Sequence, residues 1–199
     1  EPAGALLPDV QGGGGMTCIV AIEHTDGVIV AADRCVTYGG YNIEIKAQPK
    51  IWRSGECIVG ASGPVRLGNI LRTLDIPIHA CGWDVDYWVV RDFIPACIAL
   101  LAEHQYEKKT DGKADSDGNI LFVVRGRVYC IWSDWSWTRN TTGEYAIGSG
   151  YQNAAGSLSS TRTFVGNAKE RAIYALHAAA EHQSGVAEPF DILTMERPA

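Results

Sequence analysis

Two short apolar segments joined by an Asp-Gly turn constrain the fold of this chain most strongly. Thr17–Glu23 (TCIVAIE) and Val28–Ala32 (VIVAA) are rich in β-branched residues and are separated by His24-Thr25-Asp26-Gly27. Asp-Gly between two such segments is a strong signal for a β-hairpin. Because both segments are apolar at nearly every position, we expect strands that are covered on both faces. The pattern predicts a buried sheet packed between two layers.

The remaining periodic segments predict further strands and helices. The expected strands are Ile51–Arg53, Cys57–Gly60, Asn119–Val124, Val128–Trp132 and Phe190–Met195. Three helical patterns are expected: Leu67 to Leu74 with Pro64 at the first helical position, Val90 to Leu101, and Ala168 to Ala179. Pro95 inside the second pattern predicts either a kink or a helix that begins nearer to it. Helices grouped between antiparallel strands indicate stacked sheet and helix layers in one domain, residues 17–199.

Composition excludes several classes of protein. The chain has 199 residues, of which 46% are hydrophobic, and 17 basic against 23 acidic side chains give a net charge of -6. This charge argues against a broad nucleic-acid surface. No apolar run reaches the roughly 20 residues that span a bilayer, and no basic-then-apolar leader is present, so we expect neither membrane insertion nor secretion. Six cysteines without a CxxC pair predict reduced, buried thiols in a cytoplasmic protein.

Three weaker features of the sequence do not by themselves indicate a binding or catalytic site. Asp111–Gly118 (DGKADSDG) superficially resembles a calcium loop, but Lys113 interrupts the acidic alternation, so we predict a solvated turn. The five histidines lack metal-ligand spacing, and we expect neither a metal nor an organic cofactor. The cluster Trp132, Trp135 and Trp137 fits either a substrate cleft or a sheet edge or subunit contact.

Four residues near the ends of the predicted strands carry groups that enzymes use in catalysis. Thr17 opens the first strand, Asp33 ends the second, Lys50 precedes Ile51, and Gly60 follows Cys57-Ile58-Val59. A sheet of two hairpins allows a hydroxyl, a carboxylate, an ammonium group and a glycine backbone to meet at one edge.

The segment TCIVAIEHTDGVIVAADRCVT resembles the opening of proteasome β-type subunits and of HslV, which are N-terminal-nucleophile (Ntn) hydrolases. The resemblance implies that Thr17 is the nucleophile and that Asp33 and Lys50 support it. Lys50 lies one residue further along the chain than the corresponding lysine of this family, so Lys46 is a weaker competitor for that role. Gly60 in IVGASG resembles the family's oxyanion glycine.

Two later segments also resemble the family, so that the likeness extends over about residues 17–195. Ile147-Gly148-Ser149-Gly150 is similar to its G-S-G segment, and Glu181-His182-Gln183-Ser184-Gly185 is similar to its D-x-x-S-G element, with glutamate where aspartate is usual. Ser149, Glu181 and Ser184 are therefore supporting candidates for the catalytic site.

The chemistry of such a site explains the residue types. A threonine hydroxyl needs a base, and in this family the base is the nucleophile's own α-amine, whose reference pKa of about 7.7–8.0 is close to neutral. The Lys50 ammonium would lower the pKa of that amine, and Asp33 would hold Lys50 in place. The Gly60 N–H would face the developing oxyanion. The expected reaction is amide hydrolysis through a threonyl ester.

The residues before Thr17 decide whether this chemistry can run. Residues 1–16 contain two prolines and the run Gly12–Gly15, and they read as an extension joined by a flexible linker. An amide nitrogen is no base, so the form with an intact Met16–Thr17 bond is expected to be inactive. Three accounts stay open for the extension: an added tag, a propeptide, or a permanent structural arm.

The resemblance implies an α+β fold, a four-layer α/β/β/α sandwich of the Ntn-hydrolase, proteasome-like type. It also implies a self-compartmentalising threonine peptidase that acts on unfolded polypeptides. The implied assembly is a homo-oligomeric ring, stacked on a second ring and fed by an unfolding ATPase. Two alternatives remain: a catalytically silent structural subunit of a ring or shell that retains its extension, and a small-amide hydrolase.

Overall fold

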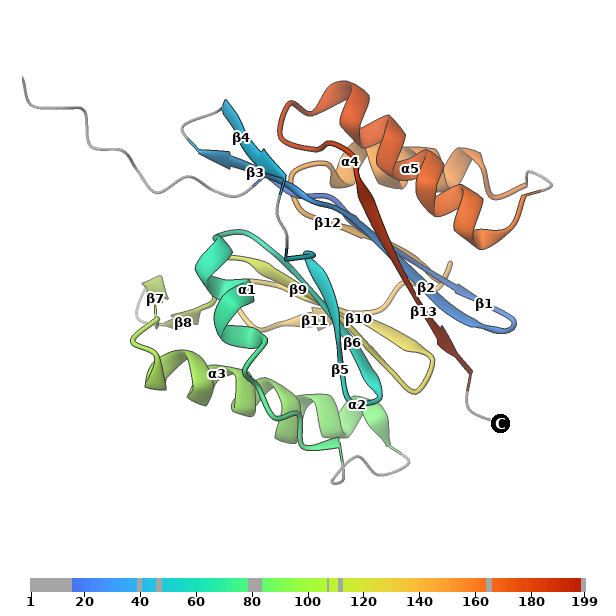
Figure 1. Ribbon diagram of the computed structural model, residues 1–199. Helices are drawn as coiled ribbons and strands as arrows, with labels where there is room; N and C mark the ends of the chain where they lie inside the picture. The colour runs from blue at the N-terminus through green and yellow to red at the C-terminus, as the bar shows by residue number, and fades with distance from the viewer. Residues whose placement is uncertain are drawn as a thin grey trace, which may run out of the picture.

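Two antiparallel sheets lie face to face between layers of helices in the computed structural model (Figure 1). The structure describes residues 16–38, 41–45, 48–78, 84–106, 108–110, 113–163 and 166–197. The strands are β1 (Ile19–His24), β2 (Gly27–Asp33), β3 (Cys35–Tyr38), β4 (Tyr41–Ile45), β5 (Ile51–Ser54), β6 (Cys57–Ser62), β7 (Lys108–Thr110), β8 (Lys113–Asp115), β9 (Asn119–Val124), β10 (Arg127–Ile131), β11 (Trp137–Thr138), β12 (Glu144–Ile147) and β13 (Phe190–Glu196). The helices are α1 (Val65–Leu71), α2 (Val85–Trp88), a π-helical turn (Val89–Phe93), α3 (Ile94–Glu103), α4 (Tyr151–Ser160) and α5 (Ala168–His182).

The predicted first hairpin forms the centre of one sheet. This sheet has the strand order β12-β1-β2-β13, and the other has the order β11-β10-β9-β6-β5. In the turn between β1 and β2, His24 pairs with Gly27, whose φ is +152°. A Cβ at Gly27 would lie 2.0 Å from the Met195 carbonyl oxygen of β13, so the neighbouring strand admits only glycine there.

The side chains of β1 alternate between two cores. Ile19 and Ala21 pack between the sheets, whereas Cys18, Val20 and Ile22 pack against α4 and α5. A third core lies between the second sheet and α1, α2 and α3 (Figure 1). The strands are thus covered on both faces, as the sequence predicted, and the four-layer α/β/β/α architecture is confirmed.

Prolines lie at the start of two helices, Pro64 one position earlier than predicted and Pro95 as one of the two predicted alternatives had it. Pro64 is the N-cap of α1 rather than its first helical residue. The chain is helical from Val85 to Glu103, and the π-helical turn immediately precedes α3, in whose first turn Pro95 lies. A wider turn accommodates a residue that has no N–H and whose ring would clash with the preceding turn. None of the helices in the described segments is long and apolar enough to cross a bilayer.

A buried carboxylate ties β12 to the helical layer. The Glu144 side chain is 7% exposed and accepts hydrogen bonds from the guanidinium groups of Arg162 and Arg171. Burial alone raises the pKa of Glu144, but the two guanidinium groups more than offset this and hold it below its usual value.

This lowered pKa predicts a pH-dependent contribution to stability. A depressed folded-state pKa stabilises the protein above the unfolded value, and the contribution disappears as pH falls through the folded one. We expect Glu144→Gln to be less stable than the wild type at pH 7. The gap between them should narrow below the ordinary glutamate value of 4.5. Urea denaturation of both proteins at pH 7 and pH 3 measures the gap; a gap that does not change with pH would contradict the assignment.

Candidate active site

The edge of the sandwich where β1 starts and β2 ends brings together three of the predicted site residues. Thr17 lies two residues before β1, Asp33 is the last residue of β2, and Lys50 precedes β5 in the opposite sheet. The antiparallel register pairs Ile19 with Ala32, which places the chain around Thr17 beside Asp33. Lys50 reaches across from the second sheet, and all three residues are buried.

Asp33 and Lys50 form an ion pair in which the ammonium group makes three hydrogen bonds and each carboxylate oxygen accepts two. Lys50 Nζ lies 2.9 Å and 2.8 Å from the two carboxylate oxygens of Asp33. The same carboxylate accepts hydrogen bonds from the backbone N–H of Cys18 at 2.8 Å and of Cys35 at 2.9 Å. These contacts fix the ammonium group relative to the backbone of β1 and β3.

Burial disfavours both charges of this pair. It raises the pKa of the Asp33 carboxyl above its usual value and lowers the pKa of the Lys50 ammonium group below its own. The attraction between the two groups opposes both shifts. Each charge is therefore sustained by its partner, and loss of one leaves the other in surroundings that disfavour it.

The third hydrogen bond of Lys50 reaches the peptide bond that precedes Thr17. Lys50 Nζ donates to the Met16 carbonyl oxygen at 2.8 Å, and the Met16 N–H donates to Thr37 Oγ1 at 3.3 Å. Gly185 packs directly against Met16, since a Cβ on this glycine would lie 2.1 Å from the Met16 Cβ. The ammonium group thus lies at the Met16–Thr17 bond rather than at a distance from it.

The loop between β12 and α4 holds the backbone of Thr17. The Thr17 N–H donates to Ser149 Oγ at 3.1 Å, and Ser149 Oγ donates to the Thr17 carbonyl oxygen at 3.3 Å. The N–H of Gly150 donates to the same carbonyl at 3.2 Å. Ser149 therefore contacts Thr17, as expected of a supporting residue of the predicted site.

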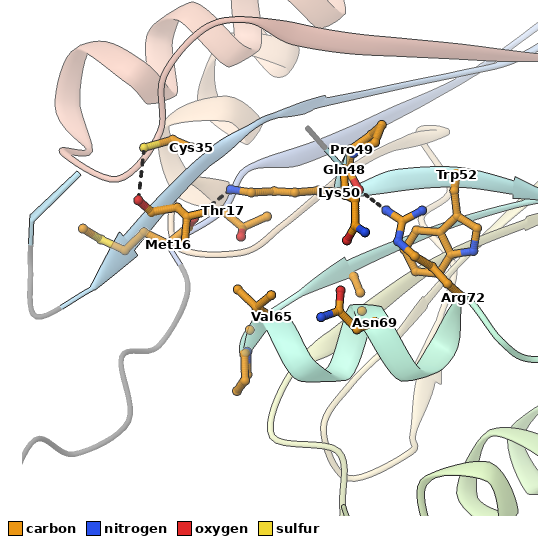
Figure 2. A pocket seen from close by; sticks show the side chains of 15 residues that line it. Met16, Thr17, Cys35, Gln48, Pro49, Lys50, Trp52, Val65, Asn69 and Arg72 are labelled. Atoms are coloured by element: carbon orange, nitrogen blue, oxygen red, sulfur yellow. Dashed lines mark hydrogen bonds between the residues drawn. The ribbon is translucent and has the colours of Figure 1, made fainter. Parts of the chain in front are cut away.

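A pocket opens beside Thr17 (Figure 2). Its wall continues from Lys50 and Cys35 to side chains of β5 and α1. The described residues that line it are Met16, Thr17, Cys35, Val36, Gln48, Pro49, Lys50, Trp52, Ala61, Gly63, Pro64, Val65, Gly68, Asn69 and Arg72. A substrate in this pocket would lie next to Thr17.

Comparison with known proteins gives a consistent result. The chain is 28% identical to proteasome subunit beta 1 of Pyrobaculum calidifontis, over 92% of this chain and 91% of that protein. Its structure superposes on Thiobacillus denitrificans BPH in complex with epoxomicin with a TM-score of 0.74, at 21% identity and covering 92% and 100% of the two chains. For eukaryotic HslV from Trypanosoma brucei the TM-score is 0.69, at 18% identity, covering 91% and 100%. No family model matches the sequence.

The chain is a proteasome-fold protein related to proteasome β subunits. The resemblance seen in the opening segment is confirmed, and so is the predicted fold class. The positions of individual site residues differ from the sequence prediction in several cases.

Gly60 lies away from the pocket of this proteasome-fold chain. It is an interior residue of β6, paired with Ile51 and Leu121, and a Cβ there would lie 3.1 Å from side-chain atoms of Ile19 and Ile51 between the sheets. Gly63, three residues later, lines the pocket with a φ of +112°. The sequence prediction chose Gly60 because it placed the end of the strand there, whereas β6 continues to Ser62.

The two candidates near the end of α5 are not brought to Thr17 by any described contact. Glu181 is exposed and lines a separate hollow between α4 and α5, together with Tyr174 and His177. Ser184 is also exposed, although its neighbour Gly185 packs on Met16. Lys46, the competitor of Lys50, lies outside the described residues.

The remaining predictions concern tryptophans and metals. Trp137 lies on β11, the edge strand of the second sheet, where it packs edge-on against Tyr129, and none of Trp132, Trp135 and Trp137 is among the described residues of the pocket wall. Within the described ranges no group of three His, Cys, Asp or Glu side chains could hold a metal ion.

Several pocket residues were missed by sequence reasoning. Trp52, Asn69 and Arg72 line the pocket although they were interpreted only as parts of a strand and a helix. Asn69 lies in the last turn of α1 and Arg72 is its C-cap, and both line the pocket. The polar character of Asn69 and Arg72, beside the buried Leu67, Ile70 and Leu71, is the signal that could have identified them.

Gly148 gives a direct test of how closely the loop holds Thr17. Its φ is +91°, and a Cβ there would lie 2.2 Å from the Thr17 carbonyl oxygen. We expect Gly148→Ala to destabilise the protein by more than about 1 kcal/mol, because alanine strains the backbone and displaces Thr17. The matched control is Gly156→Ala in α4, where a Cβ meets nothing within 4 Å and helix propensity favours alanine. Equal thermal stability of the two variants would contradict this description of the loop.

Proposed function

We propose that this proteasome-fold chain is a threonine peptidase that hydrolyses peptide bonds of unfolded polypeptides once the amino group of Thr17 is free. The observation that carries the proposal is the hydrogen bond from Lys50 Nζ to the Met16 carbonyl oxygen, made while Lys50 is paired with Asp33. The bond brings a buried ammonium group to the carbonyl of the Met16–Thr17 peptide bond, whose nitrogen would become the new terminus.

In the proposed mechanism the α-amine of Thr17 takes the proton of the Thr17 hydroxyl while Oγ attacks the substrate carbonyl carbon. The positive charge of Lys50 lowers the pKa of the amine, so that more of it is unprotonated near neutral pH. Ser149 Oγ, 3.1 Å from the Thr17 nitrogen, holds that nitrogen in position.

The tetrahedral intermediate then collapses. The carbon–nitrogen bond breaks, the leaving amine receives the proton from the Thr17 ammonium, and a threonyl ester remains. Water, deprotonated by the same amine, attacks the ester carbon. The bond from that carbon to Thr17 Oγ then breaks, the ammonium returns its proton to Oγ, and the second product leaves with a new carboxylate. We assign the backbone N–H at Gly63 as the oxyanion donor in place of Gly60, because Gly63 lies at the pocket wall.

Assembly and partners follow from the relationship rather than from a contact in this chain. We propose a homo-oligomeric ring, stacked on a second ring, with the pocket facing an inner chamber and an unfolding ATPase as a partner. The competing function is a catalytically silent structural subunit. The packing of Met16 between Thr37 and Gly185 favours it, because the residue before Thr17 is held in place rather than expelled.

Intact-mass measurement of the native particle separates the two functions. A mass that begins at Thr17, together with hydrolysis of a fluorogenic peptide, is the expected result. A mature particle that retains Met16 and cleaves no peptide would contradict the proposal and support the structural role. Removing residues 1–16 from the intact chain provides the matched comparison, since we expect peptide hydrolysis to appear only after removal.

A further inference from the structure

Polar side chains form the far end of the pocket beside Thr17. Figure 2 shows Thr17 at one end, Arg72 stacked on Trp52 at the other, and the side chains of Gln48 and Asn69 between them. Amide groups and a guanidinium group offer hydrogen-bond donors at this end, where a purely apolar pocket would offer none.

Arg72 is fixed in orientation but uses few of its donors. Its guanidinium carbon lies 4.2 Å from the centroid of the Trp52 ring, and it donates a hydrogen bond to the Pro49 carbonyl oxygen. A guanidinium group has five N–H donors in one plane, so stacking on an aromatic ring leaves its edge available to a carboxylate. Trp52 and Pro49 thus hold Arg72 without neutralising its charge.

Arg72 differs from the other half-buried arginines of the described chain. The other three each pair with a carboxylate: Arg34 with Asp191, Arg127 with Asp86 and Arg171 with Glu144. No described carboxylate pairs with Arg72, and burial alone lowers its pKa. No aspartate or glutamate is among the described residues of the pocket wall. A half-buried cation without a counter-ion suits a ligand that brings one.

The second cation at the pocket does not compete for such a ligand. Lys50 is already paired with Asp33, whose carboxylate is completely buried behind it. The unpaired positive charge of the pocket therefore lies at Arg72, at the end away from Thr17 (Figure 2). A substrate side chain that extends from the attacked residue would meet neutral amides first and the guanidinium group last.

We propose that Arg72 makes this site selective for substrates with an acidic side chain, aspartate or glutamate, on the residue whose carbonyl Thr17 attacks. The inference rests on the proposed peptidase function. Arg72 pairs with the carboxylate of the acidic side chain, and the amide groups of Gln48 and Asn69 donate hydrogen bonds to its oxygens. A basic side chain in the same place meets a like charge and is rejected.

The test uses the form that begins at Thr17 and a series of fluorogenic peptides that differ only at the attacked residue, which is Glu, Asp, Gln, Leu or Arg. We expect kcat/KM for the better of the Glu and Asp peptides to exceed that for the Gln and Leu peptides by about 10- to 100-fold. The Arg peptide should be the poorest substrate. The preference for the acidic peptide over Gln should shrink as salt concentration rises.

Variants separate selectivity from folding. Arg72→Gln should lose the preference for the acidic peptides over Gln, measured as the ratio of their kcat/KM values, and Arg72→Lys should keep part of the preference. Arg66→Gln is the matched control: it lies on the same helix but is exposed, over the Tyr106 ring, and should leave the preference unchanged. If Arg72→Gln fails to fold, Arg72→Lys and the substrate series still decide.

The outcomes distinguish this inference from the function on which it rests. Cleavage of the Leu peptide as fast as the acidic peptides, or an acidic preference that survives Arg72→Gln, overturns the inference and leaves the peptidase intact. Failure to cleave any peptide, with no covalent labelling by an epoxyketone, overturns the peptidase function and the inference with it.

Discussion

Replacing Lys50 with methionine is expected to lower the free energy of unfolding at pH 7 by about 3–5 kcal/mol. Methionine keeps most of the volume of the side chain but leaves the Asp33 carboxylate buried without its counter-ion. Loss of the Lys50 charge raises the folded-state pKa of Asp33 further, so Asp33 should take up a proton. A raised pKa contributes stability at low pH that disappears as pH rises, so the variant should recover part of its stability near pH 4. Urea denaturation at both pH values measures the effect.

Two further variants test whether the loss of stability comes from the unpaired charge of Asp33. In the double variant with Asp33→Asn and Lys50→Met no charge is left unpaired, so it should be more stable at pH 7 than Lys50→Met alone. Arg91→Met breaks the exposed ion pair with Asp92 and should change the free energy of unfolding by less than about 1 kcal/mol. A Lys50→Met protein as stable as Arg91→Met would show that the buried pair contributes little to folding.

Replacing Thr17 with alanine should reduce peptide hydrolysis by the processed form at least about 1,000-fold, because the variant lacks the proposed nucleophile. Covalent labelling by an epoxyketone, followed by mass spectrometry, should disappear in the same variant. Thr17→Ser keeps a hydroxyl and should retain measurable hydrolysis and labelling.

The Thr17→Ala variant should still fold, since the contacts of Thr17 with Ser149 and Gly150 are made by its backbone. A cooperative thermal transition close to that of the wild type is the control. Undiminished hydrolysis by a folded Thr17→Ala protein would remove Thr17 from the mechanism and leave only its place in the fold.

The sequence predicted the site best where local rules govern the chain. The Asp-Gly turn fixed the β1–β2 hairpin, and the hairpin fixed the distance from Thr17 to Asp33. Lys50 was chosen from the family resemblance, with Lys46 as a competitor, and its place directly before a strand agreed with that choice. These positions depend on turn chemistry and strand alternation, which a short segment contains in full.

Positions that depend on the end of an element or on distant packing were harder to predict. Gly60 and Gly63 differ by three residues, and only pairing with β9 shows that β6 continues past Gly60. Glu181 lies on α5, and the orientation of that helix is set by its packing against β1 and β2 rather than by its own sequence. Helix α4 was missed because its glycine and serines weaken the apolar periodicity that marks a helix.

The way in which β1 is anchored has a consequence for a newly cut chain. The first residues of most domains fray, because nothing fixes their backbone dihedrals. Here the Thr17 carbonyl accepts the N–H of Gly150, and the N–H of Cys18 donates to Asp33, so neither bond involves the residues that precede Thr17. Cleavage before Thr17 would therefore yield an end that is already immobilised. The entropy loss of ordering the reactive group would occur during folding and would not add to the barrier of the reaction.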